Sequence, residues 1–236
     1  MHSATCTGQR AFSRAPASLA AARRPAAVRR RQLRAAAAAV DSKTEKYPAW
    51  DVISKELTAA GMQTVGAEAA FDMSELGKAV LVDVRPQTDH EQAHPKGSVC
   101  VPAFLVIDSP SSPGEWAKWL ACKANGVTPT KPNPDLPALI AKAAAGDKAV
   151  ILACEAGGTL EPSVNFPTGK VSRSLKAAWK VVTNDALPAS RVKHLEGGVF
   201  RWNAAGLPMV GEYDASNAGK TPASAERPTG DYINGK

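Results

Sequence analysis

The hydrophobic residues of this chain follow two patterns that alternate along the sequence. The first has apolar side chains at helical spacing, and it predicts helices over residues 50–60, 65–71, 136–145 and 172–179. The second is a short segment rich in apolar residues, and it predicts strands over residues 80–84, 150–153 and 192–195. The strand at 80–84 is apolar on both faces, as expected of a buried parallel strand. Strands that alternate with helices predict an α/β fold with a parallel sheet.

Two segments interrupt this alternation, and we expect both to be insertions. Residues 105–136 are bordered by proline-rich stretches and hold one predicted helix with Trp116, Trp119 and Leu120. Residues 159–172 form the second insertion and contain two further prolines. The predicted order is a transit peptide, a helical extension, the main domain with both insertions and a flexible tail, at residues 1–40, 41–61, 62–211 and 212–236.

The first 40 residues have the composition of an organellar transit peptide. They hold eight arginines and neither aspartate nor glutamate. Without these arginines, 21 basic residues face 22 acidic ones, so the net charge changes from +7 to −1. The basic character therefore belongs to the leader and gives no support to nucleic-acid binding by the folded domain. The composition favours the chloroplast as destination, with the mitochondrion as the alternative.

The rest of the chain lacks the signals of a membrane span, a disulfide framework or a metal site. Its best apolar candidate, residues 99–107, is far shorter than a membrane helix and contains Pro102. Cys100, Cys122 and Cys154 are an odd set without a CxxC pair. We therefore expect a monomer that needs no cofactor and no metal and has no transmembrane segment. Peripheral association with a membrane stays open.

Cys154 is the strongest candidate for chemistry, because it follows the apolar run 150–153 and precedes the loop EAGGT. Ligands of parallel α/β sheets bind at the carboxyl ends of strands. A thiolate is the reactive form of cysteine, and N–H groups that converge from a short glycine-containing loop stabilise it. The alternative is that Cys154 is a buried core residue. The amides expected to surround the sulfur are those of Glu155, Ala156, Gly157, Gly158 and Thr159.

Three separated segments resemble one known family, and they occur in its order. The first reads LVDVR at 81–85 and continues to HPKGS at 94–98, the second is the Cys154 loop, and the third reads HLEGGVFRW at 194–202. Together they are similar to the rhodanese-like domain over about residues 65–210. The resemblance implies a five-stranded, mostly parallel sheet flanked by helices. It also implies that Cys154 carries sulfane sulfur as a persulfide.

The resemblance also implies roles for residues around the cysteine. Asp83 and Arg85 match a structural pair that ties the neighbouring loop together, and contact of Arg85 with substrate is the second interpretation. We expect His94 to satisfy backbone groups and His194 to be structural.

The sequence departs from the family pattern directly after the cysteine loop. Members continue with an arginine and a serine that opens a helix, whereas here residues 159–172 separate the loop from Arg173. Either Thr159 closes the loop, or Arg173 folds back to close it while the insertion bulges outward. Related phosphatases have a phosphate-clamping arginine at the position of Leu160, so this sequence argues against a phosphatase.

Glu155 is the second departure, because a carboxylate beside a thiolate is unfavourable. At a separation of about 6 Å and an effective dielectric near 20, the repulsion is about 2.8 kcal/mol before solvent screening. We therefore expect Glu155 to repel an anionic donor such as thiosulfate. A cationic, neutral or protein-bound sulfur donor is favoured.

Two functions agree with these residues. The first is a sulfurtransferase that moves sulfur from a donor of the thiosulfate or 3-mercaptopyruvate type to a thiol or protein acceptor. Cys154 is then the carrier, and loop 155–159, Arg173 and Arg85 contact the substrate. The alternative is a non-catalytic chloroplast module for protein interaction or redox sensing. Glu155 and the two insertions favour that alternative.

Overall fold

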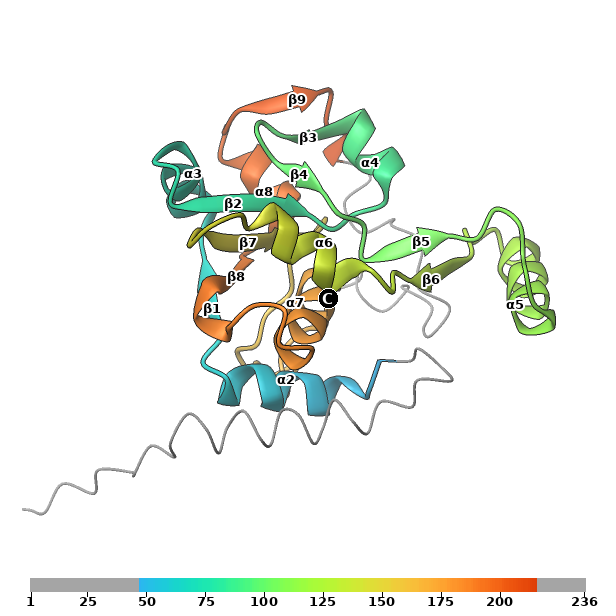
Figure 1. The fold of residues 1–236 in the computed structure, drawn as a ribbon. Helices are drawn as coiled ribbons and strands as arrows, with labels where there is room; N and C mark the ends of the chain where they lie inside the picture. Colours follow the sequence, from blue (N-terminus) through green and yellow to red (C-terminus); the bar gives the residue numbers. More distant parts are fainter. Residues whose placement is uncertain (1–46, 216–236) are drawn as a thin grey trace, which may run out of the picture.

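A five-stranded parallel sheet forms the centre of the structure, a computed structural model that describes residues 47–215 (Figure 1). Every strand pair in this sheet is parallel. The predicted α/β fold with a five-stranded sheet is therefore confirmed, whereas the predicted transit peptide and most of the predicted tail lie outside the described residues. The strand order is β1 (Gln63–Val65), β8 (Val192–Leu195), β7 (Ala149–Ala153), β2 (Ala79–Asp83) and β4 (Val99–Cys100).

Helices cover both faces of the sheet (Figure 1). The main core lies under α2 (Trp50–Ala59), α6 (Leu136–Ala143) and α7 (Arg173–Thr183). The second core lies under α3 (Ala67–Glu75) and α8 (Gly198–Ala204).

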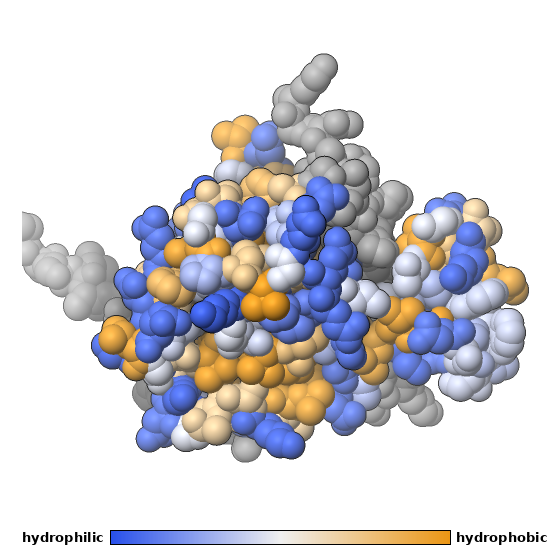
Figure 2. Space-filling model, turned by 90° about the horizontal axis from the view of Figure 1, so that it is seen from above, coloured by the Kyte–Doolittle hydropathy of each residue, from blue (hydrophilic) through white to orange (hydrophobic). Residues whose placement is uncertain are grey.

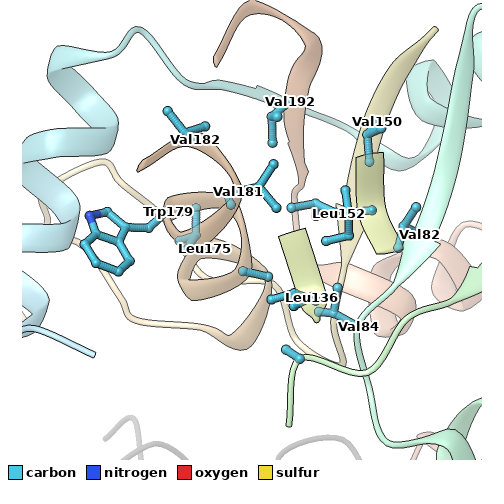
Figure 3. Close-up of a cluster of buried hydrophobic side chains, with 14 of the residues drawn as sticks. Val82, Val84, Leu136, Val150, Leu152, Leu175, Trp179, Val181, Val182 and Val192 are labelled. Atoms are coloured by element: carbon cyan, nitrogen blue, oxygen red, sulfur yellow. The ribbon is translucent and has the colours of Figure 1, made fainter. Parts of the chain in front are cut away.

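The central strand β7 supplies both cores through the alternation of its side chains. Val150 and Leu152 point into the main core, which also holds Val181 and Val182 of α7 (Figure 3). Ile151 and Ala153 point into the second core. The same alternation sends Cys154, the first residue after β7, toward the main core and α7.

Short elements differ most from the sequence prediction. Residues 63–65 form the edge strand β1, which the sequence did not predict, and α3 begins at Ala67, two residues after the start of the predicted helix 65–71. Gln63 and Thr64 are exposed, so no apolar run marked this strand. The structure also pairs β3 (Ala93–Pro95) with β9 (Met209–Gly211) and adds α4 (Gln87–Gln92) before β3.

The first insertion is an arm that extends away from the sheet (Figure 1). Its stem is an antiparallel ribbon of β5 (Phe104–Val106) and β6 (Thr130–Pro132), and its tip is α5 (Pro113–Ala124). The sequence indicated the helix but not the ribbon, because each strand has only three residues. Within residues 47–215, no helix has both the length and the apolar character needed to cross a bilayer.

His194 on β8 is a buried polar residue without a hydrogen-bonding partner among residues 47–215. Its side chain is fully buried, and neither ring nitrogen makes a hydrogen bond there. Burial lowers the pKa of His194 from 6.5 to about 4. The imidazole is therefore neutral in the folded protein at neutral pH.

The buried histidine predicts a loss of stability in acid. As the pH falls below about 6.5, the unfolded chain binds a proton that the folded chain rejects until about pH 4. This difference lowers the free energy of unfolding by up to about 3 kcal/mol at pH 4, with no contribution above pH 7. Urea unfolding of the wild type and His194→Leu between pH 4 and 8 measures it. Between pH 7 and pH 4 the wild type is expected to lose up to about 3 kcal/mol relative to His194→Leu, and parallel pH curves would contradict the assignment.

Candidate active site

Cys154 lies at the carboxyl end of the central strand, in contact with the first turn of α7. The Ser174 hydroxyl donates a hydrogen bond to the cysteine Sγ at 3.2 Å, and Sγ lies 3.4 Å from the carbonyl oxygen of Gly157, to which the thiol donates. The cysteine is only 4% exposed. Ser174 was not among the predicted site residues, although it follows Arg173 in the family motif.

The start of α8 holds the cysteine loop from the other side. The Val199 amide donates to the Cys154 carbonyl at 2.9 Å, and the Phe200 amide donates to the Glu155 carbonyl at 3.0 Å. Gly198 has a φ of +60°, and a Cβ there would lie 2.1 Å from the Cys154 carbonyl oxygen. Gly198, in the glycine pair of the third sequence motif, therefore lets the start of α8 lie directly against the cysteine loop, because any larger residue would collide with the Cys154 carbonyl.

The loop amides form only part of the predicted cradle. Within residues 47–215, the amides of residues 155–158 donate to no backbone carbonyl. The Thr159 amide is not available, because it donates to the Lys170 carbonyl at 3.0 Å. The Gly157 carbonyl faces the sulfur, so the N–H of the same planar trans peptide, that of Gly158, points away. These two positions correct the prediction that all five amides surround the sulfur.

The second insertion is closed at its base by a backbone bridge. Thr159 and Lys170 form an antiparallel bridge with two backbone hydrogen bonds of 3.0 and 2.8 Å. Residues 161–165 are exposed, with Val164 at 99%, whereas Leu160 packs against the main core and Gly169 is buried. Of the two arrangements left open by the sequence, the insertion bulges outward and the chain returns to the site at Arg173, the first residue of α7.

Arg173 is a cation whose charge interacts with that of the cysteine. The residue is half-buried, and burial lowers the pKa of its guanidinium, while the charges of Cys154, Asp89 and Glu155 oppose this effect. Arginine keeps its charge at neutral pH despite such a shift. The site therefore combines a thiol, a hydroxyl donor and a positive charge.

Arg85 is the centre of a buried ionic cluster behind the loop. Its Nη2 donates to Asp83 Oδ2 at 2.8 Å and to the Ala93 carbonyl at 2.6 Å, and its Nη1 donates to Glu155 Oε2 at 2.9 Å. Burial opposes ionisation, but hydrogen bonds from His90 and Arg85 together with the Arg85 charge lower the pKa of Asp83. Arg85 is 2% exposed and serves as scaffold in this structure rather than as an open substrate contact.

Glu155 belongs to this cluster and not to the mouth of the site. It is 8% exposed, and its second carboxylate oxygen accepts a hydrogen bond from the Tyr213 hydroxyl. This position corrects the expectation that its charge stands open toward a donor, because Arg85 compensates it. Burial and Glu155 raise the pKa of Tyr213, so its hydroxyl stays a donor. Tyr213 was not predicted as a site residue, because it lies in the segment 212–236 that the sequence analysis assigned to a flexible tail. Residues 216–236 of that segment lie outside the described part.

Two histidines extend the cluster to α4. His90 Nδ1 lies 3.1 Å from Asp83 Oδ2, and His94 Nδ1 lies 2.6 Å from the His90 carbonyl oxygen. Their rings stack at 3.9 Å between centroids. Both histidines therefore support the scaffold, and no group of three or more His, Cys, Asp or Glu residues in the described chain has the arrangement of a metal site.

Comparison with known proteins agrees with this geometry. The family model of the rhodanese-like domain matches residues 67–205, which include β2, the cysteine loop and α8. The chain belongs to the rhodanese-like domain family.

Known rhodanese-like proteins resemble the chain over similar spans. "Rhodanese-like domain-containing protein 14, chloroplastic" of Arabidopsis thaliana is 30% identical over 154 residues, which cover 63% of this chain and 65% of that protein. The chain thus spans about two-thirds of the length of this relative. The rhodanese-like domain of an Anabaena protein matches at 15% identity and a TM-score of 0.37, over 70% of this chain and 87% of that one. A thiosulfate sulfurtransferase of Pseudomonas aeruginosa matches at 17% identity and a TM-score of 0.36, over 70% and 23%.

The Arg85 cluster predicts a large difference between two arginine substitutions in this rhodanese-like domain. Arg85→Met leaves the buried carboxylates of Asp83 and Glu155 without their shared cation, so we expect the free energy of unfolding to fall by about 3–5 kcal/mol. Arg201→Met is the matched control, because Arg201 pairs with Glu196 at 3.6 Å and both side chains are more than half exposed. The control is expected to lose less than about 1 kcal/mol. Equal losses in urea unfolding would refute the scaffold role.

Proposed function

We propose that this chain is a sulfurtransferase that carries sulfane sulfur on Cys154. The observation that supports it best is the position of the Cys154 sulfur, at the carboxyl end of the central strand beside a hydroxyl donor and a loop whose amides at 155–158 donate to no backbone carbonyl of the described chain. A cysteine that only fills a core needs neither of these features. The phosphatase alternative lacks its anion clamp, since the position six residues after Cys154 is Leu160.

The first half-reaction forms a persulfide. The Cys154 thiol loses its proton to solvent, and the thiolate attacks the outer sulfur of a donor such as thiosulfate. The new S–S bond forms as the donor S–S bond breaks, and sulfite leaves with the electron pair of that bond. The Ser174 hydroxyl stays within hydrogen-bonding distance of Sγ and stabilises the attacking anion.

The loop has to change between the thiol and the persulfide states. In the thiol state the Gly157 carbonyl accepts the S–H group, but it would repel an anionic sulfur at the same position. Gly157 and Gly158 both have positive φ, which glycine tolerates, and a turn of the peptide between them would present the Gly158 N–H instead. The persulfide then has loop amides and Arg173 around its negative charge.

The second half-reaction returns the enzyme to its starting state. A nucleophilic acceptor, a small thiol or a protein cysteine, attacks the outer sulfur and releases the Cys154 thiolate. We propose anionic donors as substrates, because Arg85 compensates Glu155 and Arg173 adds a positive charge. We also propose a chloroplast location, which the arginine-rich residues 1–40 and the printed name of the Arabidopsis relative support.

One observation favours the second candidate, a non-catalytic module. Cys154 is 4% exposed, so a donor reaches the sulfur only when the loop opens. A loop that never opens would leave Cys154 inert and the scaffold free for binding alone. Sulfur loading separates the two functions directly.

The test is incubation of the reduced protein with thiosulfate or 3-mercaptopyruvate, followed by intact-mass and peptide mass spectrometry. We expect the mass of one added sulfur atom on Cys154, its absence in Cys154→Ser, and its retention in Cys100→Ser and Cys122→Ser. Ser174→Ala is expected to slow the loading about tenfold, because the thiolate loses a hydrogen bond. A wild-type chain that gains no sulfur from either donor would leave the non-catalytic module as the function.

A further inference from the structure

The outer face of α5 is apolar although it faces solvent. All residues of the stripe are exposed, including Trp116 at 51% and Leu120 at 58%. They recur at the spacing of one helix face, whereas a solvent-facing helix surface normally carries polar residues there. The residues of the stripe are Pro113, Trp116, Ala117, Leu120, Ala121 and Ala124.

The helix does not need this stripe for its own packing. Its opposite face holds the buried Cys122 and the half-buried Trp119. Glu115 on that side accepts from Lys131 Nζ of the ribbon at 2.9 Å, and Ser112 caps the helix. Hydrogen bonds from Ser111 and Lys131 lower the pKa of Glu115 to about 2. The arm is thus held together from its inner side. The Trp116 ring of the stripe packs edge-on against Trp119 of the same helix, at 5.8 Å between ring centroids, and its outer side stays exposed to solvent.

Positive charge borders the stripe on both sides. Lys118 and Lys123 flank it, and neither forms an ion pair with a residue of the described chain. Lys123 lies 5.6 Å from the centre of the Trp119 ring, and the negative charge of Glu115 is already matched by Lys131. A partner of the stripe is therefore expected to be apolar at its centre and negatively charged around it.

The size of the stripe argues against a second copy of the chain as that partner. The helix has 12 residues, which gives a length of about 18 Å, and one face of such a helix is far smaller than the ~800 Å² per partner of a stable complex. Self-pairing would also bring Lys118 and Lys123 of two copies together. A lipid surface needs no complementary groove, and tryptophan with flanking lysines suits its interface.

We propose that α5 binds the anionic surface of a lipid bilayer, with Trp116 and Leu120 entering the boundary between headgroups and acyl chains. The arm holds the helix away from the sheet, so it can reach a membrane while the domain stays in water. Figures 1 and 2 show this separation, and in Figure 2 hydrophobic groups are visible on the arm. This inference is independent of sulfur transfer.

The experiment measures quenching of tryptophan fluorescence by lipids brominated in the acyl chain. The full chain is titrated with vesicles of phosphatidylcholine alone or with added phosphatidylglycerol. Leu120→Ser keeps all five tryptophans, so its fluorescence compares directly with that of the wild type. We expect quenching with the anionic vesicles and an apparent affinity about tenfold lower for Leu120→Ser. The arginines of residues 1–40 also attract anionic vesicles, but they contribute equally to the binding of the wild type and of Leu120→Ser.

Leu76→Ser is the matched control, because Leu76 is 66% exposed at the end of α3, outside the arm. It is expected to bind and quench like the wild type. Absence of quenching in the wild type would overturn the proposal, and so would equal quenching in all three proteins. A concentration-dependent dimer that Leu120→Ser dissolves would assign the stripe to a second copy and overturn it as well.

Discussion

The buried Arg85 guanidinium is the interaction on which the rest of the site depends. It joins Asp83 at the end of β2 and the Ala93 carbonyl on β3 to Glu155 in the cysteine loop, which lies 70 residues further along the chain. Removal of either partner would leave a buried charge unpaired, which is strongly destabilising, so the cluster holds these segments together. Tyr213 extends the same constraint to the segment after β9.

The close approach of α8 is the second constraint, and it explains why the cysteine loop is both ordered and adaptable. Gly198 allows the α8 amides to hold the carbonyls of Cys154 and Glu155, which fixes the start of the loop. Gly157 and Gly158, both at positive φ, form the middle of the loop, where we propose that the peptide turns. A fixed nucleophile beside an adjustable peptide suits a sulfur that alternates between thiol and persulfide.

The sequence predicted the parts that depend on local pattern. The central strands, α7 and the cysteine loop follow from apolar runs, helical spacing and glycines, and the family motifs located Arg85. The partners of Glu155 were not predictable, because Arg85 and Tyr213 lie 70 and 58 residues away along the chain. The edge strand β1 was missed because Gln63 and Thr64 are polar and exposed, so tertiary pairing alone defines it. The orientation of the Gly157 carbonyl was likewise not predictable, because glycine adopts several backbone conformations and its sequence alone does not select one.

The most direct test of the account is a crystal structure of the chain after reaction with thiosulfate. We predict electron density for one additional sulfur bonded to Cys154 Sγ, the Gly157–Gly158 peptide turned so that the Gly158 N–H faces it, and an intact pair of Glu155 with Arg85. Density for an unmodified Cys154, with the Gly157 carbonyl still accepting from its thiol, would contradict the claim that this cysteine carries sulfur.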